Sequence, residues 1–122
     1  KRSLKVIIGT EEYAEQHSGG ISLVPLSYAL EQNFPNPFNP ETWIPYELSQ
    51  PSEVKIAIFD SRGNIVKALK LGQKPAGTYK ARDEAAYWNG RNENNENVAS
   101  GIYFYTLEAG DFNATRKMII LK

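Results

Sequence analysis

A proline-rich segment at residues 32–48, QNFPNPFNPETWIPYEL, places the strongest restriction on how this chain can fold. Its four prolines lack the N–H group that helices and central strands require, and each pushes the residue before it towards extended geometry. Three asparagines, one before the first proline and two between prolines, favour turns stabilised by side chains. The segment also carries the large side chains of Phe34, Phe38 and Trp43. It therefore predicts an ordered, extended lead-in to whatever follows.

The chain after this lead-in alternates apolar and polar side chains, a pattern typical of antiparallel strands. In the clearest run, GIYFYTLEA, we expect Tyr103, Tyr105 and Leu107 on one face of the strand and Ile102 and Phe104 on the other. Strands are expected at residues 42–48, 54–60, 65–71, 78–88, 101–109 and 112–122. About seven strands at short spacing, separated by turn residues, predict an all-β fold that is an antiparallel β-sandwich.

The chain is expected to divide near residue 28. Two short β-like pieces, residues 4–8 and 21–26, flank a polar loop at residues 9–20. We expect residues 1–28 to be a linker or the remnant of a preceding domain, with an added edge hairpin as the alternative. Residues 29–122 are expected to form the main domain. Because the first residue is Lys and not Met, we expect a piece of a longer protein.

Composition excludes several classes of function. The chain has 14 basic and 14 acidic residues and a net charge of zero, which argues against a nucleic-acid partner, since such binding needs a basic patch. Cysteine is absent, which excludes disulfides and thiolate metal sites. No apolar run is long enough to be a membrane-spanning segment.

The sequence offers no convincing catalytic group. Its one histidine, His17, lies in a polar loop without convergent partners. Asp83 and Glu84 are neighbours, so in a strand their carboxylates would point to opposite faces. Ser100 has no visible base to activate it, and the familiar nucleotide-binding and protease motifs are missing. We therefore expect that the chain is not an enzyme.

The loop at residues 89–97, NGRNENNEN, is the one candidate metal site because it is rich in oxygen donors. Calcium prefers six to eight oxygen ligands, including amide carbonyls and carboxylates. The candidate ligands are Asn89, Asn92, Glu93, Asn94 and Glu96. The EF-hand pattern is absent, and the alternative is a solvated hairpin loop held by asparagine turns. No other cofactor is expected.

The aromatic side chains allow a second binding hypothesis. A sugar-stacking platform could be formed by Trp43, Tyr87, Trp88, Tyr103 and Tyr105. A sandwich core needs large side chains of the same kind, and burying them stabilises the fold. Core packing is therefore the alternative to a platform.

The order of the motifs makes residues 29–122 resemble the C-terminal type IX secretion sorting domain (type A). The resemblance is carried by an NPFNP lead-in, an IFDSRG hairpin, a WNGRN loop, a SGIYFY strand and the ending RKMIILK. The same pattern is similar to the immunoglobulin-like domain of the flagellar hook-capping protein. One departure is Asn89, where the sorting family usually has Asp, and this weakens a carboxylate-dependent role for the loop.

The resemblance implies an immunoglobulin-like sandwich of seven strands at the end of a large secreted protein. Its implied role is sorting or anchoring through protein–protein recognition, and its implied location is secreted or cell-surface, reached through the periplasm. The implied partners are outer-membrane secretion machinery proteins and a preceding passenger domain. In hook-capping proteins a related domain is a structural scaffold, so the fold alone does not define the role.

The closing hairpin is the expected recognition surface because it lies at the end of the chain. A basic pair precedes an apolar tail there, and the candidate residues are Arg116, Lys117, Met118, Ile119, Ile120 and Leu121. The alternative is that the pair is only solvated and the tail only core. Two other functions stay open: a carbohydrate-binding or adhesive module of an extracellular protein, and a structural spacer packed on a preceding domain.

Overall fold

The computed structural model describes residues 4–7 and 22–122, and these residues form eleven strands and no helix. No helix that could cross a membrane is therefore present in this part of the chain. The strands are β1 (Leu4–Ile7), β2 (Ser22–Pro25), β3 (Ala29–Leu30), β4 (Thr42–Ile44), β5 (Tyr46–Leu48), β6 (Ser52–Asp60), β7 (Ile65–Lys74), β8 (Gly77–Tyr79), β9 (Ala86–Trp88), β10 (Gly101–Ala109) and β11 (Phe112–Ile120). The expected all-β class is confirmed. His17 and the polar loop at residues 9–20 lie outside the described residues.

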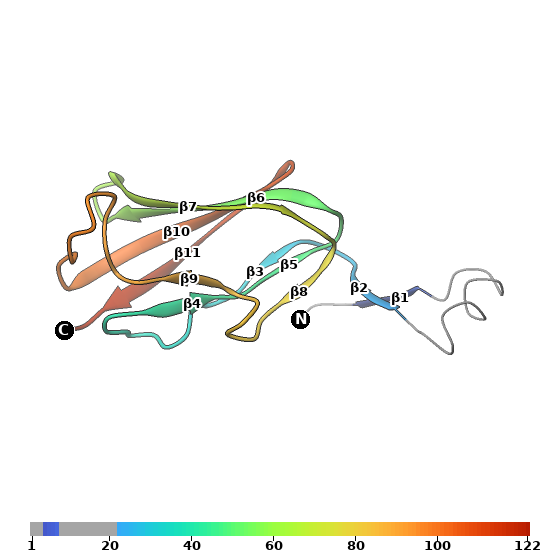
Figure 1. Cartoon of the computed structure of the whole chain (residues 1–122), viewed down its shortest axis with the longest axis horizontal. Helices are drawn as coiled ribbons and strands as arrows, with labels where there is room; N and C mark the ends of the chain where they lie inside the picture. Colours follow the sequence, from blue (N-terminus) through green and yellow to red (C-terminus); the bar gives the residue numbers. More distant parts are fainter. Residues whose placement is uncertain (1–3, 8–21) are drawn as a thin grey trace.

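Two antiparallel layers face each other in the main body (Figure 1). The first layer is a four-stranded sheet in the order β11-β10-β6-β7. The second layer contains the sheet β3-β5-β8 and the pair β4-β9. β1 and β2 form a separate two-stranded sheet beyond one end of the sandwich (Figure 1). The division of the chain at residue 28 stays a prediction.

Two of the expected strands are each broken in two. Residues 42–48 divide at Pro45 into β4 and β5, which belong to different sheets, because proline cannot continue a hydrogen-bonded ladder. The expectation of one bulged strand over residues 78–88 is wrong. A turn separates β8 from β9, with the backbone N–H groups of Glu84 and Ala85 both donating to the carbonyl of Ala81. When each broken strand is counted once, β3 to β11 make seven strands, the expected number.

The core lies between the layers, as the alternation predicts. Tyr105 and Leu107 are fully buried and Tyr103 nearly so, which confirms that these three share the inner face of β10. Trp88 is buried in contact with Phe38 and Tyr103, at ring-centroid distances of 5.7 and 6.2 Å. Other buried apolar side chains come from both layers: Ile44, Tyr46, Leu48, Val54, Ile56, Ile58, Met118 and Ile120.

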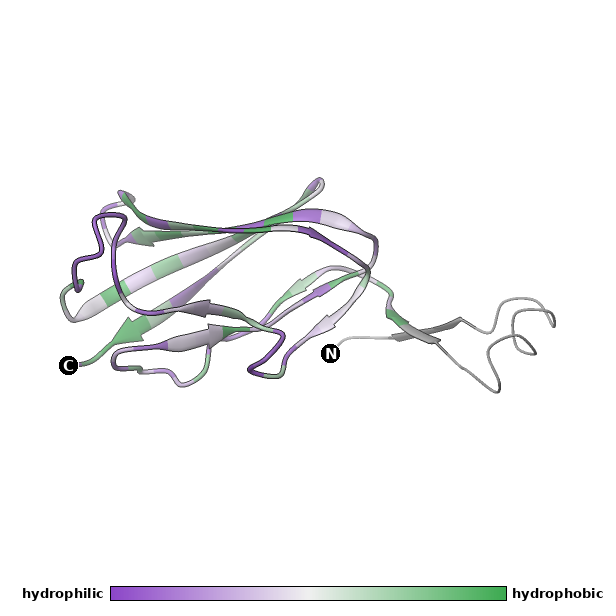
Figure 2. Ribbon diagram, viewed as in Figure 1, coloured by the Kyte–Doolittle hydropathy of each residue, from purple (hydrophilic) through white to green (hydrophobic). Residues whose placement is uncertain are grey.

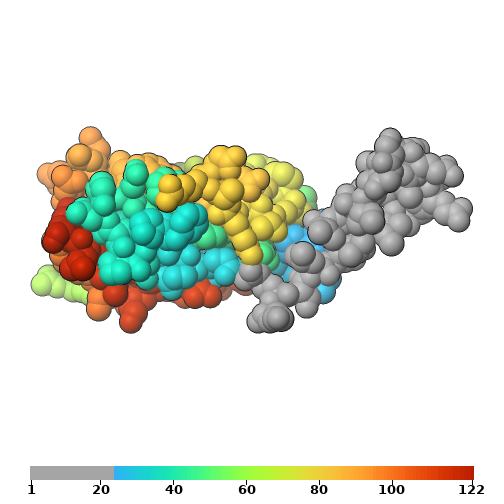
Figure 3. Space-filling view, turned by 90° about the horizontal axis from the view of Figure 1, so that it is seen from below, coloured from blue at the N-terminus to red at the C-terminus, as the bar shows by residue number. Residues whose placement is uncertain are grey.

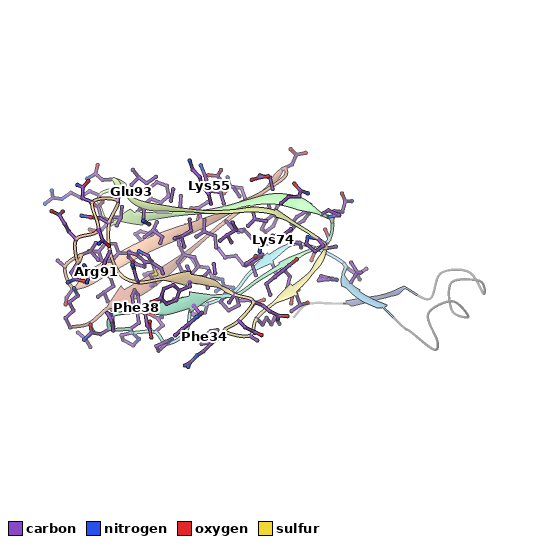
Figure 4. All side chains as sticks on the ribbon, viewed as in Figure 1. Phe34, Phe38, Lys55, Lys74, Arg91 and Glu93 are labelled. Carbon is purple, nitrogen blue, oxygen red and sulfur yellow. The ribbon has the colours of Figure 1, made fainter. Side chains whose placement is uncertain are left out.

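The proline-rich lead-in runs along the outer edge of β11. Phe38 enters the core between the layers while its backbone bonds to β11 (Figure 4). Four hydrogen bonds join the two segments: Phe38 N to Ile119 O (3.0 Å), Leu121 N to Phe38 O (3.1 Å), Ile119 N to Asn36 Oδ1 (2.9 Å) and Gln32 Nε2 to Lys117 O (2.8 Å). An uncovered strand edge is a template for pairing with another chain. The lead-in therefore closes this edge over the last part of β11.

Candidate recognition surface on the C-terminal sheet

β11 sends its alternate side chains to opposite faces, and this separates the expected recognition residues. Met118 and Ile120 point into the core and are fully or almost fully buried. Lys117 and Ile119 therefore point to the outer face of the four-stranded sheet, where Lys117 is exposed and Ile119 is half-buried. Only the second pair is available to a partner in the folded domain.

The two remaining candidates do not belong to this outer face. Arg116 occupies the same alternating position as Met118 and is exposed at the edge of the sheet, and its Nε donates a hydrogen bond to the carbonyl of Leu30 at 2.5 Å, which joins β3 of the second layer to β11. Leu121 follows the last strand and is 64% exposed. The six residues therefore do not form one continuous surface.

Cross-strand neighbours of Ile119 assemble an apolar patch that sequence reasoning did not identify. Ile119 is opposite Ile102, and two residues further along β10 Phe104 is opposite Phe59. Phe59 is in turn opposite Ile65 on β7. Residues directly opposite each other in antiparallel strands point to the same face. These five side chains, called the outer patch below, span all four strands of the sheet.

The outer patch is accessible to a partner. Ile65 and Ile102 are 58% and 45% exposed, while Phe59, Phe104 and Ile119 are half-buried against one another. Figure 2 colours the end of β11 as hydrophobic and the nearby loop at residues 89–97 as hydrophilic. In the sequence, this patch was indicated only by the apolar residues at the outward positions of the alternating strands.

Polar side chains border the outer patch. Lys117 is directly opposite Phe104, and the Thr106 and Thr115 hydroxyls hydrogen-bond to each other at 2.8 Å in the next row. Further along the sheet, Lys55 and Glu108 form an exposed ion pair at 3.6 Å, which contributes little stability. An apolar centre with a polar rim is the usual anatomy of a protein docking site.

Glu93, one of the candidate calcium ligands, instead covers the other edge of this sheet. Its backbone N–H donates to the carbonyl of Val66 at 3.1 Å, and its Oε2 accepts from the Ala68 N–H at 2.9 Å. Its Oε1 lies 3.7 Å from Lys67 Nζ. Figure 4 shows Glu93 beside the start of β7. Glu93 therefore makes the hydrogen bonds to β7 that a neighbouring strand would make there.

The other candidate calcium ligands hold the loop itself in shape. Asn92 Oδ1 accepts from the backbone N–H groups of Asn94 and Glu96, and Asn92 Nδ2 donates to Glu96 Oε1. Asn89 Oδ1 accepts from Arg91 N at 3.0 Å. Within residues 4–7 and 22–122, no cluster of three or more histidine or acidic side chains could hold a metal ion. Calcium binding by this loop stays a prediction.

The five aromatic residues of the expected platform divide between the core and the surface. Trp88, Tyr103 and Tyr105 are buried. Trp43 is half-buried and Tyr87 is 46% exposed, and both point to the outer face of the second layer. The five rings therefore cannot act together as a sugar-binding platform.

The titratable groups with shifted pKa values are mostly tyrosines. Burial raises the pKa of Tyr105 to about 12, although its hydrogen bond with Asn33 and the charge of Arg116 act in the other direction. Burial also raises the pKa of Tyr46 and of Tyr103. The Tyr103 and Tyr105 hydroxyls are structural hydrogen-bond donors, to the carbonyls of Ala99 and Glu31.

Comparison with known proteins gives a family and a fold. The family described as FlgD Ig-like domain matches residues 41–111, which is more than half of the chain. A solved structure of dimeric latent PorU from Porphyromonas gingivalis is similar, with a TM-score of 0.60 and 14% identity over 84% of this chain. This chain spans 10% of that protein, so the likeness shows the fold alone. No curated protein matches the sequence.

Proposed function

The chain belongs to the family of FlgD immunoglobulin-like domains, and from that premise we propose that it is a non-catalytic sorting and anchoring module. In this proposal it directs a secreted protein from the periplasm through an outer-membrane export machine to the cell surface. The partner is a protein of that machine, and the cargo is a passenger domain that precedes the module. The order of the motifs, which resembles that of the type IX sorting domain, supports this role.

The outer patch is the observation that carries the proposal. Exposed apolar patches that span several strands are uncommon on a protein surface unless another protein covers them. The patch includes Ile119 and is bordered by Lys117, two of the residues expected to mediate recognition. A partner that covers Ile65 and Ile102 would remove two strongly exposed apolar side chains from water. Burial of each contributes about 1.5–3 kcal/mol at most.

Deleting the C-terminal strand would not test this role. Residues 112–122 supply Met118 and Ile120 to the core, and removing a buried side chain of this size typically costs about 2–5 kcal/mol. The total stability of a domain is only about 5–15 kcal/mol. The truncated chain would unfold, and export would be lost for that reason alone.

Substitution on the outer face is a cleaner test. The whole chain is fused to a neutral reporter in a host that has the export machine. The unchanged module is expected to bring the reporter to the cell surface, and the double variant Ile65→Thr/Ile102→Thr is expected to leave it in the periplasm. Threonine keeps the branched β-carbon that strands favour, so stability is expected to change by about 0.5 kcal/mol or less per site.

The matched control is Tyr87→Thr, which alters an exposed side chain on the other layer and is expected to leave export unchanged. Thermal melting of the three purified chains checks that all are folded. Export of the double variant at the level of the unchanged module would refute the outer patch as the recognition surface. Failure of the unchanged module to export the reporter would refute the sorting role itself.

A further inference from the structure

A row of three aromatic rings lies on the outer face of the second layer, and Figure 3 views the molecule from the side of this layer. Trp43 of β4 is opposite Tyr87 of β9, and Phe34 pairs with Trp43 on its other side. The ring centroids of Trp43 and Tyr87 are 5.5 Å apart, and those of Phe34 and Trp43 are 6.2 Å apart. Backbone hydrogen bonds of 2.8 and 2.9 Å fix Phe34 to Trp43. These three residues are called the aromatic row.

The aromatic row is not part of the core. In β4 and β9 the inward positions Thr42, Ile44 and Trp88 are buried, whereas the outward positions Trp43 and Tyr87 are accessible. Large aromatic side chains contribute most to stability when they are buried. The exposed Tyr87 ring and the half-buried Phe34 and Trp43 rings therefore contribute less to core packing than buried rings would.

Two polar side chains contact the row and supply both kinds of hydrogen-bonding group: Glu41 lies beside it, and Arg82 lies over the Trp43 ring. The Tyr87 hydroxyl donates to Glu41 Oε1 at 2.6 Å, so this carboxylate is held beside the ring as an acceptor. The guanidinium carbon of Arg82 lies 4.5 Å from the Trp43 ring centroid. A stacked guanidinium is held in place by the ring, while its N–H groups remain available as donors at its edge.

We propose that the aromatic row, together with Glu41 and Arg82, binds a neutral oligosaccharide. A sugar ring has an apolar face of C–H groups that stacks on aromatic rings, and a border of hydroxyls that both donate and accept hydrogen bonds. The site offers a related arrangement: the Arg82 guanidinium covers one face of the central Trp43 ring, the Phe34 and Tyr87 rings lie on either side of it, and the Glu41 carboxylate lies at the rim.

The local charges and the paired backbone argue against the other ligand classes. The exposed carboxylates of Asp83 and Glu84 lie beside Arg82 in the sequence, so the site has no excess positive charge for nucleic acid or an acidic polysaccharide. Both edges of β4 are already paired, one with β9 and the other with Phe34, so an extended peptide cannot add to it as a strand. The inference is independent of the proposed sorting function.

Calorimetric titration of the full chain with cellohexaose, mannohexaose and laminarihexaose tests the proposal. At least one of these neutral hexasaccharides is expected to bind saturably, and Tyr87→Ala is expected to weaken that binding by about tenfold or more. Tyr87→Phe keeps the ring and is expected to retain most of the affinity. The matched control is Ile65→Ala, an exposed site on the other layer, which is expected to bind as the unchanged chain does.

Thermal melting of each variant confirms folding, and Tyr87→Phe keeps the test valid if the alanine variant is unstable. The proposal would be overturned if none of the three hexasaccharides bound saturably. It would also be overturned if a hexasaccharide bound equally well to the unchanged chain, to Tyr87→Ala and to Tyr87→Phe. A proline decapeptide is titrated in parallel, because aromatic surfaces also bind polyproline helices. Binding of that peptide in place of the sugars would identify the row as a protein-docking surface and overturn the sugar assignment.

Discussion

Replacing Tyr105 with phenylalanine is predicted to lower the free energy of unfolding by about 2–4 kcal/mol, although only one oxygen atom is removed. The Tyr105 hydroxyl accepts a hydrogen bond from the Asn33 backbone N–H at 2.8 Å and donates one to the Glu31 carbonyl at 2.7 Å. Tyr105 is fully buried and Asn33 is 2% exposed, so water cannot replace the lost hydroxyl at Asn33. The hydroxyl therefore fixes the lead-in to β10.

The magnitude follows from what the substitution leaves behind. A buried donor without a partner costs about 1–3 kcal/mol, and this applies to the Asn33 N–H. The lost bond to the partly buried Glu31 carbonyl contributes about 1 kcal/mol more. Phenylalanine fills the same space as the tyrosine ring, so no cavity adds to the cost.

Urea unfolding of the full chain at neutral pH measures the effect through the transition midpoint at a common slope. The matched control is Tyr87→Phe, which removes a hydrogen bond of 2.6 Å to Glu41 from an exposed site. Water replaces that bond, so the control is expected to change stability by about 0.5 kcal/mol or less. A similar small loss for Tyr105→Phe would refute the argument that the buried hydroxyl holds the lead-in.

Three further predictions concern other parts of the structure. Because burial raises the pKa of Tyr105 to about 12, the folded chain retains a proton that the unfolded chain releases above its usual pKa. The contribution of the Tyr105 hydroxyl to the free energy of unfolding is present below about pH 10 and falls by about 1.4 kcal/mol per pH unit up to about pH 12. Thermal melting of Tyr105→Phe should therefore show a smaller loss of stability between these pH values than melting of the unchanged chain. At Gly90, φ is +78° and an added Cβ would lie 2.4 Å from the Pro40 carbonyl oxygen. Gly90→Ala should therefore cost about 3 kcal/mol in urea unfolding, whereas Gly63→Ala, with open space at φ +89°, should cost only about 1 kcal/mol; equal losses would contradict the steric argument. Removing the side chain at Glu93 should uncover part of β7, and sedimentation velocity should detect increased self-association relative to the unchanged chain; a monomer at every concentration would count against edge protection.

Alternation along single strands was readable from the sequence, but the breaks between strands were not. In β10 every second residue faces the core, so Tyr105 and Leu107 could be assigned without knowing the partner strands. Residues 80–85 contain no glycine, proline or asparagine to indicate a turn. Ile44 pairs with Ala86, and Tyr46 pairs with Tyr79. Only Pro45 therefore lies opposite residues 80–85, and these six residues leave the ladder as a turn. The break at Pro45 between β4 and β5 is thus matched by the break between β8 and β9 in the neighbouring segment.

The outer patch depends on register, which the sequence does not state. The outward faces of Ile102 and Ile119 follow from alternation, but their position opposite each other is set by the β10–β11 hairpin. Ile65 lies opposite Phe59 only because a register shift occurs between Ile58 and Phe59. A slip of one residue would turn the side chains of a strand to the other face. The sequence therefore indicated the part of the outer patch that lies on β11, but not the rest of the patch across the sheet.

Two features that looked unrelated in the sequence protect the two edges of the same sheet. The lead-in covers the last part of β11, and Glu93 covers the start of β7. Both covered stretches are next to the outer patch, since they include Ile119 on one side and follow directly after Ile65 on the other. A partner strand therefore cannot extend the sheet at these places without displacing the lead-in or the loop. A partner that binds at the patch, as we propose, would therefore have to contact the open face, where exposed side chains and not the backbone would provide the contacts.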